Sequence, residues 1–336
     1  MIKSHRIVFR KPNSIKIEEA KLPELSSGQI LVKTLVTLIS AGTEITALTG
    51  RFPPNSAWSR YVRYPFYPGY SNVGIVIDVG DSVRDIREGD RVASLAGHTE
   101  YAILNEKDVV KVPEGITDEE AAFHTIASGV MHSVRLANIL LGDVVVIIGA
   151  GLLGQLATQF SRLSGAYPVI VIDLIRKRLE LAKTSGATEI INPIEENVED
   201  KIRDITKGRM ADIVFEVTGE PTVIPWAIKL VRPQGRLIIL SSPRGPTQLD
   251  FHDEVNAPSR IIMGTHFSSQ PTYETPYYPW TRRRNIELFF ELLTAGIIKT
   301  RHLITHIFPW YEAQKAYETL LKNKEEALGV ILDFRK

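Results

Sequence analysis

Short apolar runs separated by turn-forming residues dominate the first third of the chain. They occupy residues 15–17, 30–36, 73–79 and 101–104, partly alternate with polar positions, and are bounded by Gly, Pro and Asp. Alternation with a period of two is typical of strands that bury one face, and Gly, Pro and Asp end strands and form turns. The pattern therefore predicts an antiparallel, barrel-like β domain.

The spacing of apolar residues changes at about residue 118. Ala121, Ala122, Ile126, Val130 and Val134 recur at helical intervals, and beyond Gly142 short apolar runs alternate with amphipathic segments. Such alternation predicts strands joined by helices, and hence an α/β fold with a doubly wound parallel sheet. The predicted strands are 144–148, 169–172, 190–191, 213–215, 237–240 and 260–263, and the predicted helices are 152–163, 177–184 and 223–231. Two further helices, 282–295 and 310–321, and a terminal strand, 329–334, follow.

The apolar run 144–148 leads directly into a glycine-rich turn. That turn reads Gly149-Ala150-Gly151-Leu152-Leu153-Gly154. In this context the first glycine makes the tight turn, Gly151 lets the backbone approach a pyrophosphate, and Gly154 lets the following helix pack against the strand. The amino end of that helix offers N–H groups and a positive dipole end to phosphates. The segment therefore predicts a dinucleotide site.

An acidic residue, Asp173, ends the next apolar run. A carboxylate there can accept hydrogen bonds from both adenosine ribose hydroxyls and repels a 2′-phosphate, so NAD is predicted before NADP. Arg176, Lys177 and Arg178 keep NADP open, because a nearby arginine can hold a 2′-phosphate. A solvated first helical turn is the simpler interpretation of these three cations. Arg178 and Thr218 complete the set of candidate cofactor contacts.

Composition excludes several classes of protein. Of the 336 residues, 40 are Lys or Arg and 39 are Asp or Glu, and this balance gives no electrostatic footprint for nucleic acid or an acidic membrane surface. No apolar run approaches the length of a membrane span and the first residues carry no signal-peptide core, so a cytoplasmic protein is expected. Cysteine is absent, which removes disulfides, thiolate nucleophiles and cysteine-ligated metal sites.

Several short motifs together give the chain a family resemblance. They are Pro68-Gly69, Val73-Gly74 to Gly80, Gly89-Asp90-Arg91-Val92, Glu100-Tyr101, Gly149 to Gly154, Glu216-Val217-Thr218-Gly219 and Ile304 to Pro309. With these the chain resembles the medium-chain dehydrogenase/reductase superfamily, the alcohol dehydrogenase-like proteins. The resemblance implies a Rossmann sheet inserted in a GroES-like β-barrel catalytic domain, with the catalytic domain at 1–127, the nucleotide domain at 128–267 and a return to the catalytic domain at 268–336. It also implies hydride transfer between a nicotinamide and a carbonyl or alcohol, and a homodimer or homotetramer formed through the last strand of the nucleotide domain.

The chain departs from the zinc-bearing members at their metal ligands. It has Ala41-Gly42-Thr43-Glu44 where they have Cys-Gly-Thr/Ser-Asp, and Gly69-Tyr70-Ser71 where they have Gly-His-Glu. His124 is assigned to the third ligand position. Alanine has no donor atom, and tyrosine and serine are poor zinc ligands at neutral pH. No catalytic zinc is therefore expected. With Trp280-Thr281-Arg282-Arg283-Arg284, these segments are similar to a zinc-lacking branch that includes bacteriochlorophyllide hydroxyethyl dehydrogenases.

Without a metal, another group must stabilise the negative charge that develops on the substrate oxygen. We expect His124 to act as general acid/base, because its ordinary pKa of about 6.5 suits proton transfer at neutral pH. Thr43 is then the proton relay and Tyr70 the hydrogen-bond donor to the substrate oxygen. The alternatives are that His124 is a structural histidine whose hydrogen bonds are satisfied within its helix, that Tyr70 only forms part of the pocket wall, and that Thr43 is a turn hydroxyl. His132 is interpreted as structural.

Aromatic residues gather in two segments, Phe52 to Tyr70 and Phe267 to Trp280. Aromatic walls suit a bulky, flat or sugar-like substrate, although subunit contacts are also rich in Tyr and Trp. The expected substrate pocket comprises Glu44, Trp58, His98, Tyr278 and Trp280, with an ion pair or helix cap as the alternative for Glu44. Arg282, Arg283 and Arg284 either bind an anionic group or form a solvated helix face.

The sequence thus favours a zinc-independent, NAD(H)-linked alcohol dehydrogenase or carbonyl reductase. A quinone or enone reductase is the rival enzyme, since hydride delivery to a carbon–carbon double bond does not require His124. A nucleotide-binding protein without turnover is the rival outside enzymes.

Overall fold

The computed structural model describes residues 2–336, which form two compact units. The first unit contains the chain up to Ile126 together with Ile286–Lys336, and the second contains Ala127–Asn285. The chain thus leaves the first unit, builds the second and returns. This mixed α/β architecture is the expected fold class. No helix within residues 2–336 is long and apolar enough to cross a membrane.

The predicted return at residue 268 differs from the division in the structure, because residues 268–285 pack with the second unit. Side chains of this segment contact helix α4 (His124–Ala137). The Tyr278 hydroxyl lies 3.2 Å from Nδ1 of His132, and the Arg135 guanidinium stacks 3.3 Å above the Trp280 ring centroid. Sequence order alone does not reveal contacts of this kind.

The first unit is built around a seven-stranded sheet and a separate hairpin. The sheet has the order β14-β15-β3-β4-β5-β7, with β6 paired to β3. Its strands are β3 (Gln29–Leu38), β4 (Asn72–Val79), β5 (Arg91–Ser94), β6 (Tyr101–Asn105), β7 (Val110–Lys111), β14 (Ile304–Pro309) and β15 (Gly329–Asp333). The hairpin joins β1 (Lys3–Lys11) to β2 (Ser14–Lys21). All pairings are antiparallel except β14 with β15, and the expected antiparallel β domain is present.

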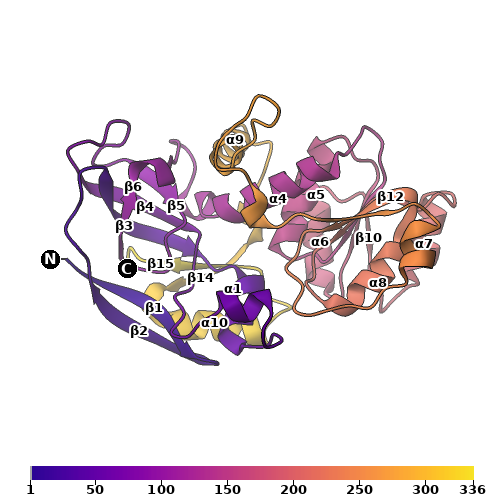
Figure 1. The fold of residues 1–336 in the computed structure, drawn as a ribbon, viewed down its shortest axis with the longest axis horizontal. Coiled ribbons are helices and arrows are strands. Elements are labelled where there is room, and N and C mark those ends of the chain that lie inside the picture. The colour runs from indigo at the N-terminus through magenta and orange to yellow at the C-terminus, as the bar shows by residue number, and fades with distance from the viewer. Residues whose placement is uncertain (1) are drawn as a thin grey trace. The chain divides into compact units, whose positions relative to one another are not determined.

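Three helices matter most for the site in this unit. They are α1 (Ala41–Thr49), α2 (Ala57–Tyr61) and α10 (Ala313–Lys322), and α1 lies beside α10 (Figure 1). Ile7, Phe9, Leu48, Tyr317 and Leu332 share a buried apolar cluster that joins these helices to strands β1 and β15. Burying each large apolar side chain contributes roughly 1.5–3 kcal/mol, so this cluster anchors α1 firmly.

The second unit is a six-stranded, wholly parallel sheet with the order β10-β9-β8-β11-β12-β13. Its strands are β8 (Val145–Ile148), β9 (Val169–Ile172), β10 (Glu189–Ile191), β11 (Ala211–Glu216), β12 (Val231–Ile239) and β13 (Ile261–Gly264). The main connecting helices are α5 (Leu152–Leu163), α6 (Arg176–Thr184), α7 (Val198–Ile205) and α8 (Ile224–Ala227). The order reverses at β8 and β11, as the prediction of a doubly wound sheet requires.

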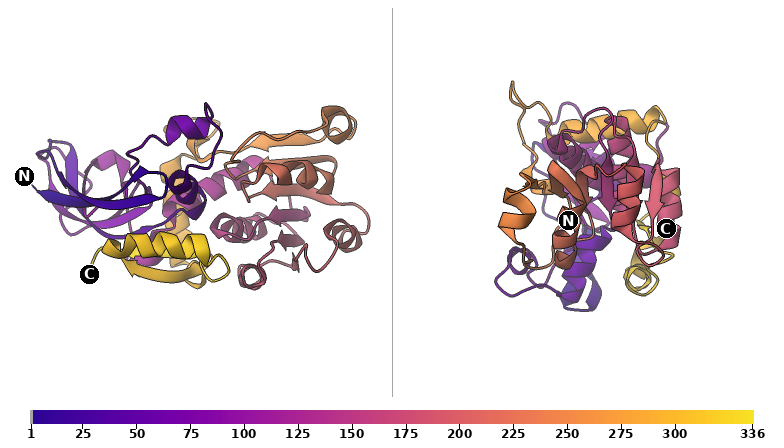
Figure 2. Two further views of the ribbon diagram at one scale, coloured as in Figure 1. Left: turned by 90° about the horizontal axis from the view of Figure 1, so that it is seen from below. Right: turned by 90° about the vertical axis from the view of Figure 1, so that its right-hand side faces the viewer.

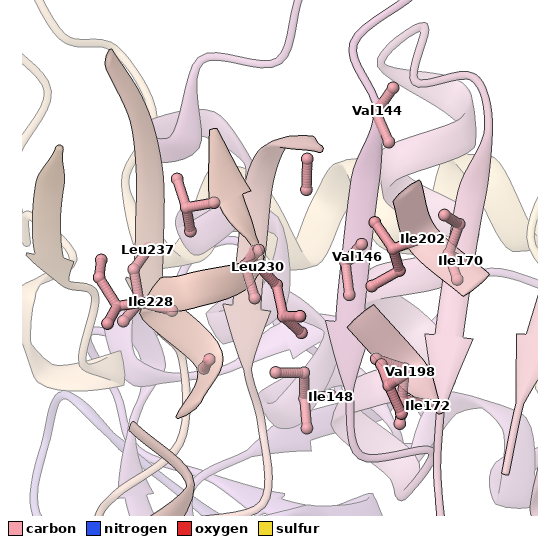
Figure 3. Packing of buried hydrophobic residues seen from close by; sticks show 14 of the residues in the cluster. Val144, Val146, Ile148, Ile170, Ile172, Val198, Ile202, Ile228, Leu230 and Leu237 are labelled. Atoms are coloured by element: carbon pink, nitrogen blue, oxygen red, sulfur yellow. The ribbon is translucent and has the colours of Figure 1, made fainter. Parts of the chain in front are cut away.

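Alternate residues of the central strands serve opposite faces of this sheet. Val146 and Ile148 join a buried cluster with Ile202 of α7 and Ile228 (Figure 3). The intervening residue Ile147 points the other way, toward Gly154 of α5. Helices therefore cover both faces (Figure 2), which explains why the central strands β8 and β9 are apolar throughout instead of alternating.

Two local differences from the expected elements have clear causes. The predicted helix 223–231 is a short α-helix, Ile224–Ala227, between two 3₁₀ turns, and Pro225 lies in its first turn, where its missing N–H is tolerated. Helices α1 and α2 were not predicted, since nine and five residues are too few to show a clear helical period.

Candidate functional site

The glycine-rich turn has the geometry that a pyrophosphate requires. Gly149 has φ 107°, and a Cβ atom on Gly154 would lie 1.9 Å from the carbonyl oxygen of Gly149, so neither position accepts another residue. A Cβ atom on Gly151 would meet nothing within 4 Å. Gly151 is the N-cap of α5, and Leu152 and Leu153 form its first turn. Open space therefore adjoins the positive end of the helix dipole.

Asp173 connects the end of β9 to this turn. Its Oδ2 accepts a hydrogen bond from the Ala150 amide at 2.7 Å, and its Oδ1 accepts one from the Ile175 amide at 2.8 Å. Each carboxylate oxygen keeps a second lone pair, so ribose hydroxyls can still bind. The residues of this edge fit an adenosine ribose.

The three cations after Asp173 have different environments. Arg176 forms ion pairs with Glu195 at 3.0 Å and with Glu180 at 3.3 Å, as expected of a solvated helix face. Arg178 is half-buried, and this burial lowers its pKa while the charge of Asp173 opposes the shift. Arg178 is therefore close enough to Asp173 for their charges to interact.

Glu216, at the end of β11, organises the neighbouring loops. It is fully buried, and its Oε1 accepts hydrogen bonds from the amides of Thr218 and Gly219 at 2.7 and 3.1 Å and from the Thr218 hydroxyl. Its Oε2 accepts one from the Ser241 hydroxyl. This role was not predicted from the sequence, although a carboxylate directly after the apolar run 213–215 is a signal for it.

A cluster of hydroxyl groups forms in the first unit, where α1 begins. The Tyr70 hydroxyl donates a hydrogen bond to Oγ of Ser40, and Thr43 also hydrogen-bonds to Tyr70. Desolvation and then the charge of Glu44 raise the pKa of Tyr70 above its ordinary range, against the effect of both hydroxyl groups. Tyr70 therefore keeps its proton at pH 7 and can donate a hydrogen bond.

Glu44 and His98 form a buried, hydrogen-bonded pair in the same unit. Glu44 Oε2 lies 2.8 Å from His98 Nε2 and accepts a hydrogen bond from the Tyr317 hydroxyl, while His98 Nδ1 lies 2.7 Å from the Thr37 hydroxyl. The sequence of hydroxyl, imidazole and carboxylate resembles a hydrolase triad. Thr37, however, is completely buried, so no substrate reaches its hydroxyl. Glu44 and His98 lie beneath the surface rather than lining a pocket.

His124 is also completely buried. Its Nδ1 lies 3.1 Å from the Ala121 carbonyl oxygen, and its Nε2 lies 3.2 Å from that of Ser94 and 2.9 Å from the Thr125 hydroxyl. Burial lowers its pKa to about 4. Both ring nitrogens thus face protein atoms, and this geometry favours the histidine satisfied within its helix over the acid/base that the sequence suggested.

The expected aromatic pocket residues are divided between the two units. In the first unit Trp58 stacks on Phe52, with centroids 6.3 Å apart, and meets the edge of Tyr61. Burial and then the charge of Glu44 raise the pKa of Tyr61, and Tyr61 adds a smaller contribution to the raised pKa of Tyr70, so all three belong to one neighbourhood. Tyr61 was not singled out from the sequence.

Tyr278 and Trp280 belong to the second unit. Trp280 lies between the guanidinium groups of Arg135 and Arg284, and Arg284 also pairs with Glu274 at 3.8 Å. The Arg282 guanidinium lies 5.9 Å from the Phe267 ring centroid. Arg282 and Arg284 therefore contact residues of their own unit.

Comparison with known proteins agrees with this fold. The family model "Alcohol dehydrogenase GroES-like domain" matches residues 26–114, and the model "Zinc-binding dehydrogenase" matches residues 153–282. The two matches together span about two thirds of the chain. The chain belongs to the medium-chain dehydrogenase/reductase superfamily. It is an NAD(P)-dependent oxidoreductase of that type.

Relatives of this dehydrogenase/reductase match it almost end to end. A sorbitol dehydrogenase from Bacillus subtilis is 28% identical, with 97% of this chain and 96% of the relative covered. An L-threonine 3-dehydrogenase from Pyrococcus furiosus is 28% identical, with 95% of each covered. A solved Escherichia coli alcohol dehydrogenase in complex with NADH has a TM-score of 0.82 at 21% identity, with 98% of this chain and 99% of the other covered, and shows the shared fold.

The name of the second family model raises the question of zinc. Within residues 2–336 no three His, Cys, Asp or Glu side chains form a group that could hold a metal ion. Ala41 has no donor atom, the Tyr70 hydroxyl is bonded to Ser40, and the ring nitrogens of His124 face backbone carbonyls. The residues of this dehydrogenase/reductase therefore do not fit a catalytic zinc ion.

Proposed function

We propose that this dehydrogenase/reductase interconverts an alcohol and a carbonyl compound without zinc, with the Tyr70 hydroxyl as the proton donor to the substrate oxygen. The bound nicotinamide supplies or accepts the hydride. The observation that carries the proposal is the neutral phenol of Tyr70, held by Ser40 and Thr43 where zinc-bearing members have a histidine ligand. Preorganised donors at a developing oxyanion are often the largest single contribution to catalysis.

Thr43 keeps its relay role in this proposal, and His124 does not keep the acid/base role. A buried imidazole with a pKa of about 4 is neutral at pH 7, and its nitrogens face Ala121, Ser94 and Thr125. The contact between His124 and the carbonyl of Ser94, at the end of β5, makes a structural role the simpler one for this histidine.

The relatives suggest the class of substrate. Sorbitol and L-threonine, which the names of two relatives give as substrates, both carry a secondary alcohol beside another polar group. Trp58 and Tyr61 add aromatic faces near Tyr70, and such faces suit the C–H side of a sugar or a flat ring. We infer a secondary alcohol with a polar neighbour, on a sugar-like or flat carbon frame.

The cofactor of this reaction is inferred to be NAD(H) rather than NADP(H). Asp173 directly follows β9 and has a carboxylate whose oxygens each accept one amide hydrogen bond and keep a lone pair for a ribose hydroxyl, and Arg176, which could otherwise hold a 2′-phosphate, is paired with Glu195. The E. coli neighbour was solved with NADH, in agreement with this inference.

A homo-oligomer through strand β13 is also proposed. β13 is an edge strand of the parallel sheet, and Ile261 on it is about half exposed. An unpaired strand edge of this kind readily pairs with a second copy. Light scattering of the purified protein tests this proposal, and a monomeric mass would contradict it.

A substrate screen tests the proposed function. NADH oxidation is followed with ketoses, hydroxyketones, quinones and enones, and NAD⁺ reduction with polyols. We expect activity with ketoses or polyols and none with enones, and activity with enones alone would favour the double-bond reductase. Tyr70→Phe should lower kcat by roughly 10²-fold to 10³-fold while NADH affinity stays within about twofold.

A further inference from the structure

Ser40 occupies a helix N-cap but does not cap. It precedes α1 with φ −83° and ψ 85°, and its side chain accepts no hydrogen bond from the first turn. Other polar N-caps in the chain do: Ser56 accepts from the Ser59 amide, Thr117 from Glu120 and Asn197 from Asp200. Serine is favoured at this position because its hydroxyl satisfies an amide of the first turn. The Ser40 hydroxyl has another partner.

That partner is Tyr70, whose hydroxyl donates to Oγ of Ser40. The backbone of Ser40 is held separately, because its amide donates to Oε1 of Glu44 at 2.8 Å. Glu44 is fixed in turn by His98 and Tyr317 on its other oxygen. A buried network thus holds the main chain of Ser40 while its hydroxyl is turned away from the helix toward Tyr70.

We propose that Ser40 is a positioning residue for proton transfer by Tyr70, an inference that rests on the proposed function. When a carbonyl is reduced, its carbon gains the hydride and its oxygen gains the Tyr70 proton. The O–H bond of Tyr70 breaks, the O–H bond of the product forms, and the phenolate later regains a proton from water. Before substrate binds, the Ser40 hydroxyl accepts the hydrogen bond of the phenol. When a carbonyl binds, the phenol O–H turns to the substrate oxygen and the Ser40 hydroxyl rotates to donate to the phenol oxygen, which it continues to do once the phenolate has formed, since a hydroxyl group can both accept and donate.

A purely local role for Ser40 would have different consequences. A turn hydroxyl that only stabilises the start of α1 would affect unfolding independently of Tyr70 and would not affect kcat. A positioning residue, by contrast, must act through Tyr70 both on unfolding and on kcat. The two interpretations therefore separate in a double-mutant cycle.

The first measurement needs no substrate. Urea midpoints are compared for the unmodified protein, Ser40→Ala, Tyr70→Phe and the double variant, with Asn197→Ala plus Tyr70→Phe as the control pair in a remote cap. We expect the urea midpoint of the double variant at Ser40 and Tyr70 to fall by clearly less than the sum of the decreases in the two single variants. In the control pair the two decreases should add. Additive losses at Ser40 and Tyr70 would overturn the proposal.

The second measurement uses the substrate found in the screen. Ser40→Ala should lower kcat for carbonyl reduction at least tenfold, with KM changed less than threefold. Ser40→Thr keeps the hydroxyl group, so its kcat should stay within about threefold of the unmodified protein. In the Tyr70→Phe protein, Ser40→Ala should lower kcat no further. An equal loss in both backgrounds would overturn the role of Ser40. If Tyr70→Phe keeps full activity, the proposed function fails instead, and the urea cycle alone then decides whether the Ser40–Tyr70 contact is coupled.

Discussion

The carboxylate of Glu44 lies 2.8 Å from Nε2 of His98, and both side chains are completely buried. The same carboxylate also binds the Ser40 amide and the Tyr317 hydroxyl. The Thr37 hydroxyl of β3 binds the other nitrogen of His98. Side chains from β3, α1, the loop after β5 and α10 thus meet at one buried point. The pair fixes the start of α1, where the candidate substrate site lies.

Glu44→Gln should therefore destabilise the protein by about 2 kcal/mol, because the amide replaces one acceptor oxygen by a donor and leaves buried partners of Glu44 without their hydrogen bond. The free energy of unfolding in urea measures this loss. Glu100→Gln is the matched control, since Glu100 pairs with His5 at 2.7 Å but both side chains are partly exposed. Its cost should stay below about 1 kcal/mol. Equal costs for the two variants would contradict the account.

His124 should make the stability of the protein depend on pH. Its pKa is about 4 in the folded state against 6.5 for the free side chain, so below pH 6.5 the unfolded chain binds a proton that the folded chain does not. The stability that depends on neutral His124 is fully present above pH 6.5 and is lost as the pH falls toward 4. Between pH 7 and pH 5 this group should remove about 2 kcal/mol.

Urea unfolding of the unmodified protein and His124→Gln at both pH values measures that contribution. The loss between pH 7 and pH 5 should be about 2 kcal/mol smaller in the variant, whose kcat at pH 7 should remain within about threefold. Equal pH dependence in both proteins would contradict the buried, neutral state. A 10²-fold fall in kcat would restore His124 as the general acid/base.

Asp173→Ala should weaken NADH binding about tenfold or more and narrow the preference for NADH over NADPH, because the ribose loses its hydrogen-bond acceptors. Arg176→Ala is the control and should change neither affinity by more than about twofold, since Arg176 is paired with Glu195. Fluorescence titration with both nucleotides gives the affinities. Tighter binding of NADPH to the unmodified protein would show that the cations after Asp173 decide the choice.

Gly154→Ala should abolish NADH binding and destabilise the protein, because its Cβ atom would lie 1.9 Å from the Gly149 carbonyl oxygen. Gly151→Ala should fold normally, since its Cβ atom meets nothing within 4 Å of the protein, yet it should weaken NADH binding by intruding on the pyrophosphate space. Thermal unfolding and nucleotide titration separate the two effects. Normal NADH binding by Gly151→Ala would place the pyrophosphate elsewhere.

Local sequence patterns predicted the parts of this molecule that depend on neighbours in the chain. The strands β8 and β9, the helix α5 and the glycine turn lie within a few residues of their expected bounds. Such elements are set by apolar periodicity and by backbone conformations that only glycine adopts.

The rest depends on contacts between distant residues. Glu44 meets His98 and Tyr317, 54 and 273 positions away, and nothing in the local pattern announces either contact. His124 was proposed as a catalytic residue because its burial cannot be read from its neighbours. Tyr278 was assigned to the catalytic domain by its place in the chain, whereas it lies in the second unit, where its hydroxyl contacts His132.

The most direct test of the central claim is kcat for carbonyl reduction by the unmodified protein and by Tyr70→Phe, both dialysed against EDTA. We expect the unmodified protein to keep its full rate, because its residues do not fit zinc, and kcat of the variant to fall by roughly 10²-fold to 10³-fold with NADH affinity unchanged. Loss of activity in EDTA that zinc restores, or an undiminished rate in Tyr70→Phe, would contradict it.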